Sequence, residues 1–138
     1  MITIEDLFGT LQQSVVSGWR KHLRTAKYAK HEALDDFYKE MPELVDKLIE
    51  GWMGANGTKI KNYNNILQSS NMNTLKYLKE LKGIVKQGYP LMGDNSDLKA
   101  SLDDILELIN TTLYKVKELS ENEFMDLKDF ILENLNED

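Results

Sequence analysis

The apolar residues of this chain recur at steps of three and four along its length, and this spacing limits the fold more than any other feature of the sequence. The step is clearest in two stretches: Ile4, Leu7, Leu11 and Val15, and Leu98, Leu102, Ile105 and Ile109. Such spacing places apolar side chains on one face of a helix, whereas strands show alternation. The sequence therefore predicts an all-α protein, and 138 residues predict a single domain over residues 1–138.

Start and stop signals divide this pattern into helices. The first helix is expected to begin after Thr3, whose side chain can form a capping box with Asp6. The second is expected from about Tyr28 to Met53, and Pro42 inside it should kink or split the helix. Further helices are predicted over about 73–87 and 97–119, with a separate short tail helix after the capping box at 120–123 and an uncertain short helix around 63–67.

The connection between the second and third helices is nearly twenty residues long, polar and rich in asparagine. Simple up-and-down bundles use shorter loops. Two long helices, a long connection and two further helices are typical of a ferritin-like four-helix bundle with a crossover connection. We therefore expect this architecture, completed by the short C-terminal tail helix.

Composition excludes several classes of function. The chain has no cysteine, which rules out disulfides, zinc–thiolate sites and thiol nucleophiles. Seventeen basic and 23 acidic residues give a net charge of −6, which argues against a nucleic-acid partner. No apolar run approaches the roughly 20 residues that span a bilayer, and the sequence contains neither a phosphate-binding loop nor a nucleophile elbow. We expect a cytoplasmic protein with no membrane partner.

Three residues have the spacing of a metal site shared between two chains. Asp46 and Glu50 lie one turn apart on one helix face and could hold a divalent cation. His31 lies fifteen residues before Asp46, about 22 Å along the same helix, so it cannot join them within one chain. If two copies of this helix cross antiparallel near residues 39–40, two equivalent sites form. Alternatively, the carboxylates are solvated or paired with Lys39 and Lys47, and the histidines are ordinary hydrogen-bonded core residues.

The stretch from His31 to Glu50 resembles the signature of Dps-type miniferritins: a His, a Tyr seven residues later (Tyr38), then Asp46 and Glu50 four residues apart. The resemblance implies a four-helix bundle that assembles into hollow dodecamers and oxidises ferrous iron at sites shared across a dyad. It thus implies iron as the metal, His31, Asp46 and Glu50 as ligands, and a homo-oligomer of two or more copies. The chain lacks the lysine-rich N-terminal tail of DNA-binding members.

A second histidine fits this resemblance less directly. The family's other histidine falls twelve residues before the position of His31, where this chain has Trp19. His22 is nine residues before His31, and in an unbroken helix the two would lie on opposite faces. His22 can therefore join the site only if the helix breaks near residues 25–27.

The sequence is also similar to small uncharacterised phage-borne proteins, through His22, the Tyr-Ala-x-His run over 28–31, and Tyr114-Lys115. Two functions remain open at this stage. One is Dps-like iron binding, with ferroxidase activity undecided, in the host cytoplasm if the protein is phage-encoded. The other is a non-enzymatic helical bundle that acts as an adaptor, an inhibitor or a virion component.

Overall fold

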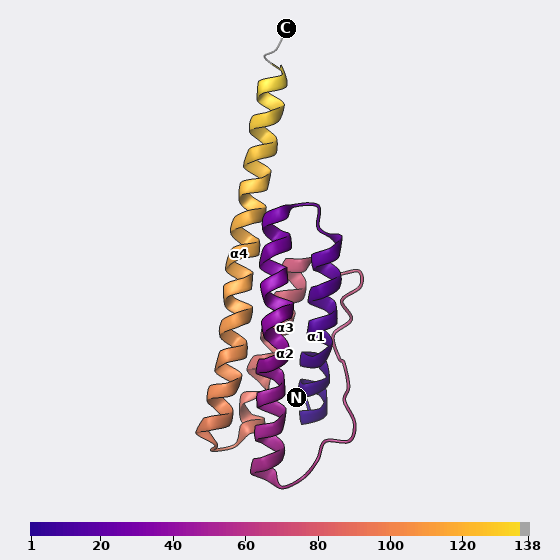
Figure 1. Cartoon of the computed structure of the whole chain (residues 1–138), viewed down its shortest axis with the longest axis vertical. Coiled ribbons are helices and arrows are strands. Elements are labelled where there is room, and N and C mark those ends of the chain that lie inside the picture. The colour runs from indigo at the N-terminus through magenta and orange to yellow at the C-terminus, as the bar shows by residue number, and fades with distance from the viewer. Residues whose placement is uncertain (136–138) are drawn as a thin grey trace.

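The computed structural model of this chain is a helical bundle with one long projecting helix (Figure 1). It describes the backbone of residues 1–135 and the side chains of residues 1–118. Its elements are α1 (Ile4–Arg24), α2 (Tyr28–Asn56), α3 (Thr74–Gln87), the 3-10 turn η1 (Tyr89–Met92) and α4 (Ser96–Leu135). No strand occurs in residues 1–135, so the prediction of an all-α protein with four main helices is confirmed.

The helices begin and end at the local signals in the sequence. At the start of α1 the Thr3 amide donates to Asp6 Oδ2 (3.0 Å) and the Asp6 amide donates to Thr3 Oγ1 (3.1 Å), which completes the capping box. Asn73 caps α3 by accepting a hydrogen bond from the Lys76 amide (2.8 Å). Gly57 ends α2 with a φ of 64°, a conformation that glycine adopts at little cost.

The apolar stripes of the four helices meet in one core. α2 packs between α1 and α4, and α3 packs against α4 and more lightly against α1. Burial of these stripes provides the main driving force for folding. The largest fully buried side chains are Tyr77, Phe8, Phe37, Leu7, Leu11, Leu34, Met41, Leu48, Leu78, Leu81, Leu102 and Ile105.

Residues 57–73, here named the strap, carry the chain back along α1 from the end of α2 to the start of α3 (Figure 1). Hydrogen bonds hold the strap against α1: the Asn64 amide donates to the Glu5 carbonyl (3.1 Å), and the Ile66 amide donates to Thr10 Oγ1 (3.0 Å). Because the strap returns along the bundle before α3 begins, α2 and α3 run in the same direction. The predicted long crossover is therefore present, whereas the short helix around 63–67 is not formed, because the strap directs these backbone groups to α1.

Two expectations are corrected by the structure. Pro42 does not split α2, which is a single helix; its ring lies on the exposed face, where water can satisfy the carbonyl that loses its partner. The tail is not a separate helix, because no glycine or proline interrupts the chain near 120–123 and α4 continues to Leu135. Phe37 of α2 is fully buried against Gly18 of α1.

The last part of α4 extends past the end of the bundle that holds the α1–α2 turn (Figure 1). We call residues 119–135 the overhang; at about 1.5 Å per residue it is roughly 25 Å long. None of the described helices is long and apolar enough to cross a membrane.

Candidate functional site

Two histidines face each other across the short turn between α1 and α2. α1 ends at Arg24 and α2 begins at Tyr28, so the break that the sequence required near residues 25–27 is present. The rings of His22 and His31 stack with centroids 3.5 Å apart and planes 27° apart. His22 Nδ1 donates to the backbone carbonyl of His31 (2.7 Å), and His31 Nδ1 donates to that of His22 (2.9 Å). This reciprocal pair locks the turn.

The direction of these two bonds fixes the tautomer of both rings. A carbonyl oxygen only accepts hydrogen bonds, so each Nδ1 must carry the proton. The Nε2 lone pair of each neutral ring is then left for another partner. Histidines that bind metals usually have this arrangement, with the other ring nitrogen donating to a backbone carbonyl or a carboxylate.

Aromatic rings surround the histidine pair on the outer side. Trp19 stacks on Tyr38 with centroids 6.0 Å apart, and Tyr38 lies 5.1 Å from His22. His22 is buried and His31 is half-buried, while Trp19 remains 50% exposed. Trp19 therefore offers a large apolar surface beside a buried polar pair, on the face shared by α1 and α2.

Asp35 belongs to this cluster, although sequence reasoning did not select it. Its Oδ1 lies 3.7 Å from His22 Nε2, and its Oδ2 accepts a hydrogen bond from Lys39 Nζ (2.8 Å). The bond from Lys39 is the main reason that the pKa of Asp35 lies below its usual value. The sequence did contain a signal for Asp35: it follows His31 by four residues, and residues four apart lie on the same face of a helix.

Asp46 and Glu50 lie farther along α2, on the surface. Asp46 borders a shallow depression of about 210 Å³ between α1 and α2, together with Val15 and Pro42. Neither carboxylate forms a hydrogen bond or ion pair with another described residue, and Lys39 is bound to Asp35 instead. Of the predicted alternatives, pairing of these carboxylates with Lys39 or Lys47 is not observed among the described residues, whereas their exposure agrees with the alternative in which they are solvated.

The structure brings together His22 and His31 but leaves Asp46 and Glu50 at a distance. In the part of the chain with described side chains, no three His, Asp or Glu groups are placed to hold a metal ion. One strip of the α2 surface nevertheless carries His31, Pro42 and Asp46. Pro42 follows His31 by eleven residues and Asp46 follows Pro42 by four, and these steps correspond to about three turns and about one turn of an α-helix. A single chain thus presents two separate parts of a possible site on one face.

Fold and site together define a small all-helical bundle protein with a hydrogen-bonded histidine pair at one end. Residues 22–116 match the profile of a family of unknown function (DUF5856), and the chain belongs to that family. The chain is also similar to an uncharacterised 14.6 kDa protein encoded in the mobD–ri intergenic region of Enterobacteria phage T4, with 33% identity over 55 residues.

This alignment covers 40% of the present chain and 43% of the phage protein, so less than half of that relative is matched. No solved structure matches the chain. The predicted similarity to an uncharacterised phage protein is confirmed. Neither the family nor the relative is described as a Dps protein or a ferritin, so that resemblance stays a prediction.

Proposed function

We propose that two copies of this protein bind a divalent first-row metal between them, with ferrous iron as the first candidate. His31 of one copy would supply an imidazole nitrogen, and Asp46 and Glu50 of the other would supply carboxylate oxygens. The observation that carries the proposal is the strip of α2 that presents His31 and Asp46 on the same face. An antiparallel crossing midway between them puts each histidine opposite the other copy's carboxylates.

The surface on this strip suits contact between two copies. Trp19 is half exposed, Pro42 is exposed and Val15 is partly exposed, so apolar surface lies between the two parts of the site. Aromatic side chains are enriched in protein interfaces because they bury a large area at low entropic cost. An isologous two-fold contact here would create two equivalent sites.

The chemistry of these groups fits the metal. Imidazole and carboxylate ligands suit ferrous iron and zinc, and among residues 1–118 no partner competes for the Asp46 and Glu50 carboxylates. The Nδ1 bond to the His22 carbonyl holds the His31 ring in one tautomer, with Nε2 unprotonated while the ring is neutral. As a substrate, ferrous iron would lose one electron to dioxygen or a peroxide, and the paired carboxylates would stabilise the more highly charged ferric product.

The stacking of the rings assigns different roles to the two histidines. An imidazole binds a metal in its own ring plane, and two stacked planes 3.5 Å apart do not both point to one ion. His31 is the more exposed ring and is the proposed ligand. His22 orients His31 through the reciprocal bond, and would bind the same ion only after its side chain rotates.

The double substitution Asp46→Asn and Glu50→Gln tests this proposal. It removes two negative charges at nearly constant volume, so zinc or ferrous-iron affinity should fall sharply while the folded fraction is unchanged. A matched control, Asp104→Asn with Glu107→Gln, removes the same charge from exposed positions of α4, outside the strip. Titration calorimetry and the rise of ferric absorbance are the readouts. Equal metal binding by the two double variants would refute the proposal.

A non-enzymatic adaptor is the second candidate, and one observation favours it: His22 and His31 are hydrogen-bonded to each other's backbone, as structural histidines are. In that case the α1–α2 face would bind a protein partner without metal. Wild-type protein that shows no metal-dependent heat and no iron oxidation above the rate in buffer would support this function.

A further inference from the structure

All of the net charge of this chain comes from its last twenty residues. Residues 119–138 contain seven acidic residues and one lysine, which gives −6. The whole chain has 23 acidic and 17 basic residues, so residues 1–118 contain 16 of each and are neutral overall. The acidic segment includes the overhang.

The overhang has the pattern of a helix that is covered by a partner. Its sequence carries apolar residues at steps of three and four, at Phe124, Leu127, Ile131 and Leu135. In Figure 1 it runs beyond α1, α2 and α3, and no other described element lies beside it. A helix of this length is only marginally stable alone in water, so a contact that covers the apolar face would stabilise it.

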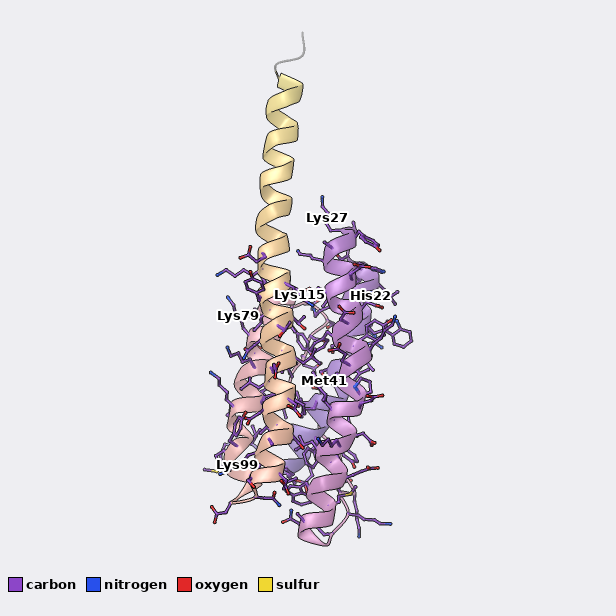
Figure 2. All side chains as sticks on the ribbon, turned by 60° about the vertical axis from the view of Figure 1, so that its left-hand side comes forward. His22, Lys27, Met41, Lys79, Lys99 and Lys115 are labelled. Atoms are coloured by element: carbon purple, nitrogen blue, oxygen red, sulfur yellow. The ribbon has the colours of Figure 1, made fainter. Side chains whose placement is uncertain are left out.

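The end of the bundle from which the overhang projects is basic. Between Arg20 and Lys30 the chain has five basic residues and no acidic one. Figure 2 shows Lys27 at this end of the bundle, where α4 continues past it. A cavity of about 390 Å³ opens here, lined by Lys21, Arg24 and Lys30 and by the apolar side chains of Met72, Leu75 and Val116.

Two cations of this cavity, Lys21 and Arg24, are hydrogen-bonded to backbone carbonyl groups. Lys21 Nζ donates to the carbonyls of Ser69 (3.2 Å) and Met72 (2.5 Å), and Arg24 Nη1 donates to the carbonyl of Ser70 (3.4 Å). Burial, and secondarily the charge of Arg24, lower the pKa of Lys21. Neither Lys21 nor Arg24 has a carboxylate partner among the described residues, so their charge is available to an acidic segment.

We infer that the acidic overhang of one copy docks on the basic end of a second copy, and that the two overhangs pair antiparallel about a two-fold axis. Each copy carries both complementary parts, as an isologous interface requires. An overhang of roughly 25 Å reaches from its own base to the base of an antiparallel neighbour, with the axis near its midpoint at residue 127. The apolar stripes meet, and the acidic tip of each helix reaches the partner's cavity.

A parallel pairing of two overhangs is less favourable, because it would leave the tip of each overhang, a helix of net charge −4, far from the basic end of the partner. The proposed contact is small for a protein interface, and it depends on opposite charges. It should therefore be reversible and weaken with salt. It uses a different surface from the α1–α2 face and needs no metal, so it does not depend on the proposed function.

A charge-swap experiment tests this inference in the full-length chain. One variant carries Arg24→Glu and Lys27→Glu at the basic end; the other carries Glu121→Lys, Asp129→Lys and Glu133→Lys in the overhang. Sedimentation equilibrium is measured at low ionic strength with a metal chelator, and circular dichroism confirms folding. We expect each variant alone to dimerise at least about tenfold more weakly than wild type. An equimolar mixture should regain dimers, because each overhang again meets an end of opposite charge.

Three outcomes would overturn the inference. Wild-type protein could be monomeric at low salt. Either variant could dimerise as well as wild type. The mixture could show no gain over the separate variants although both are folded. In the last case the overhang would have a different partner, and the adaptor function would be examined next.

Discussion

The close contact between α1 and the strap makes a sharp prediction for Gly9. A Cβ added there would lie 2.3 Å from the Asn64 amide nitrogen, 2.5 Å from its carbonyl carbon and 2.4 Å from its carbonyl oxygen. Ordinary contacts between such atoms need about 3.5–4.0 Å. Because the obstacle is backbone, no rotation of a side chain can relieve it, and in Gly9→Ala the strap must move by more than about 1 Å.

Three effects set the size of the change. The displacement breaks the hydrogen bonds from the Asn64 amide to Glu5 and from the Ile66 amide to Thr10, each worth about 1 kcal/mol. Overpacking at a rigid site adds roughly 1–3 kcal/mol. Alanine regains about 1 kcal/mol of helix propensity over glycine. The net expectation for Gly9→Ala is a loss of about 2–4 kcal/mol in the free energy of unfolding.

Gly83→Ala is the matched control, because it makes the same change in the middle of α3 with no heavy atom within 4 Å of the new Cβ. It should stabilise the protein by about 0.5–1 kcal/mol. Urea unfolding of both variants gives the two values. If Gly9→Ala is as stable as Gly83→Ala, the strap does not lie against α1 as described, and the crossover account is wrong.

Three further predictions concern the core, the histidine pair and the tail. Burial raises the pKa of Tyr77 to about 12, above the value near 10 in the unfolded chain. Between about pH 10 and 12 the tyrosine therefore ionises only in the unfolded chain, so the free energy of unfolding should fall over this range. Alkaline unfolding of Tyr77→Phe should show a smaller loss. His22→Ala should cost about 2 kcal/mol by breaking the reciprocal bond, whereas the exposed neighbour Leu23→Ala should stay within about 0.5 kcal/mol, both measured by urea unfolding. A chain ending at Glu118 should still unfold cooperatively on heating, because the described residues of all four main helices already form a buried core that extends from Leu7 to Val116. A chain that fails to fold would contradict this description.

Much of the fold follows from local chemistry that a single sequence reveals. Three helix ends depend only on residues within four positions of one another: the capping box of Thr3 and Asp6, the cap at Asn73, and the αL residue Gly57. Such interactions do not depend on the rest of the molecule. The helix starts and stops could therefore be predicted to within a few residues.

Features that depend on distant parts of the chain could not be predicted in this way. No helix forms at 63–67, because amide groups of the strap donate hydrogen bonds to Glu5 and Thr10 of α1. These contacts join residues that are far apart in the sequence. The capping box at 120–123 is also compatible with a helix interior, and α4 continues through it.

The candidate site was predictable only in part. Spacing selected His31, Asp46 and Glu50, and helix geometry showed that His22 needs a break near residues 25–27, which the structure contains. The exchange of backbone bonds between the two histidines could not be foreseen, because it depends on the path of the turn.

The proposed metal site is tested most directly by mixing two inactive variants. His31→Gln removes the imidazole but keeps an amide that can donate to His22, while Asp46→Asn with Glu50→Gln removes the carboxylates. Each variant alone should bind no zinc at the site. If the site is shared, statistical exchange makes half of the dimers mixed, and each mixed dimer has one intact site of two. Titration of the equimolar mixture should then recover about a quarter of the wild-type sites. Zinc binding that stays absent in the mixture, although the dimers exchange, would contradict the shared metal site.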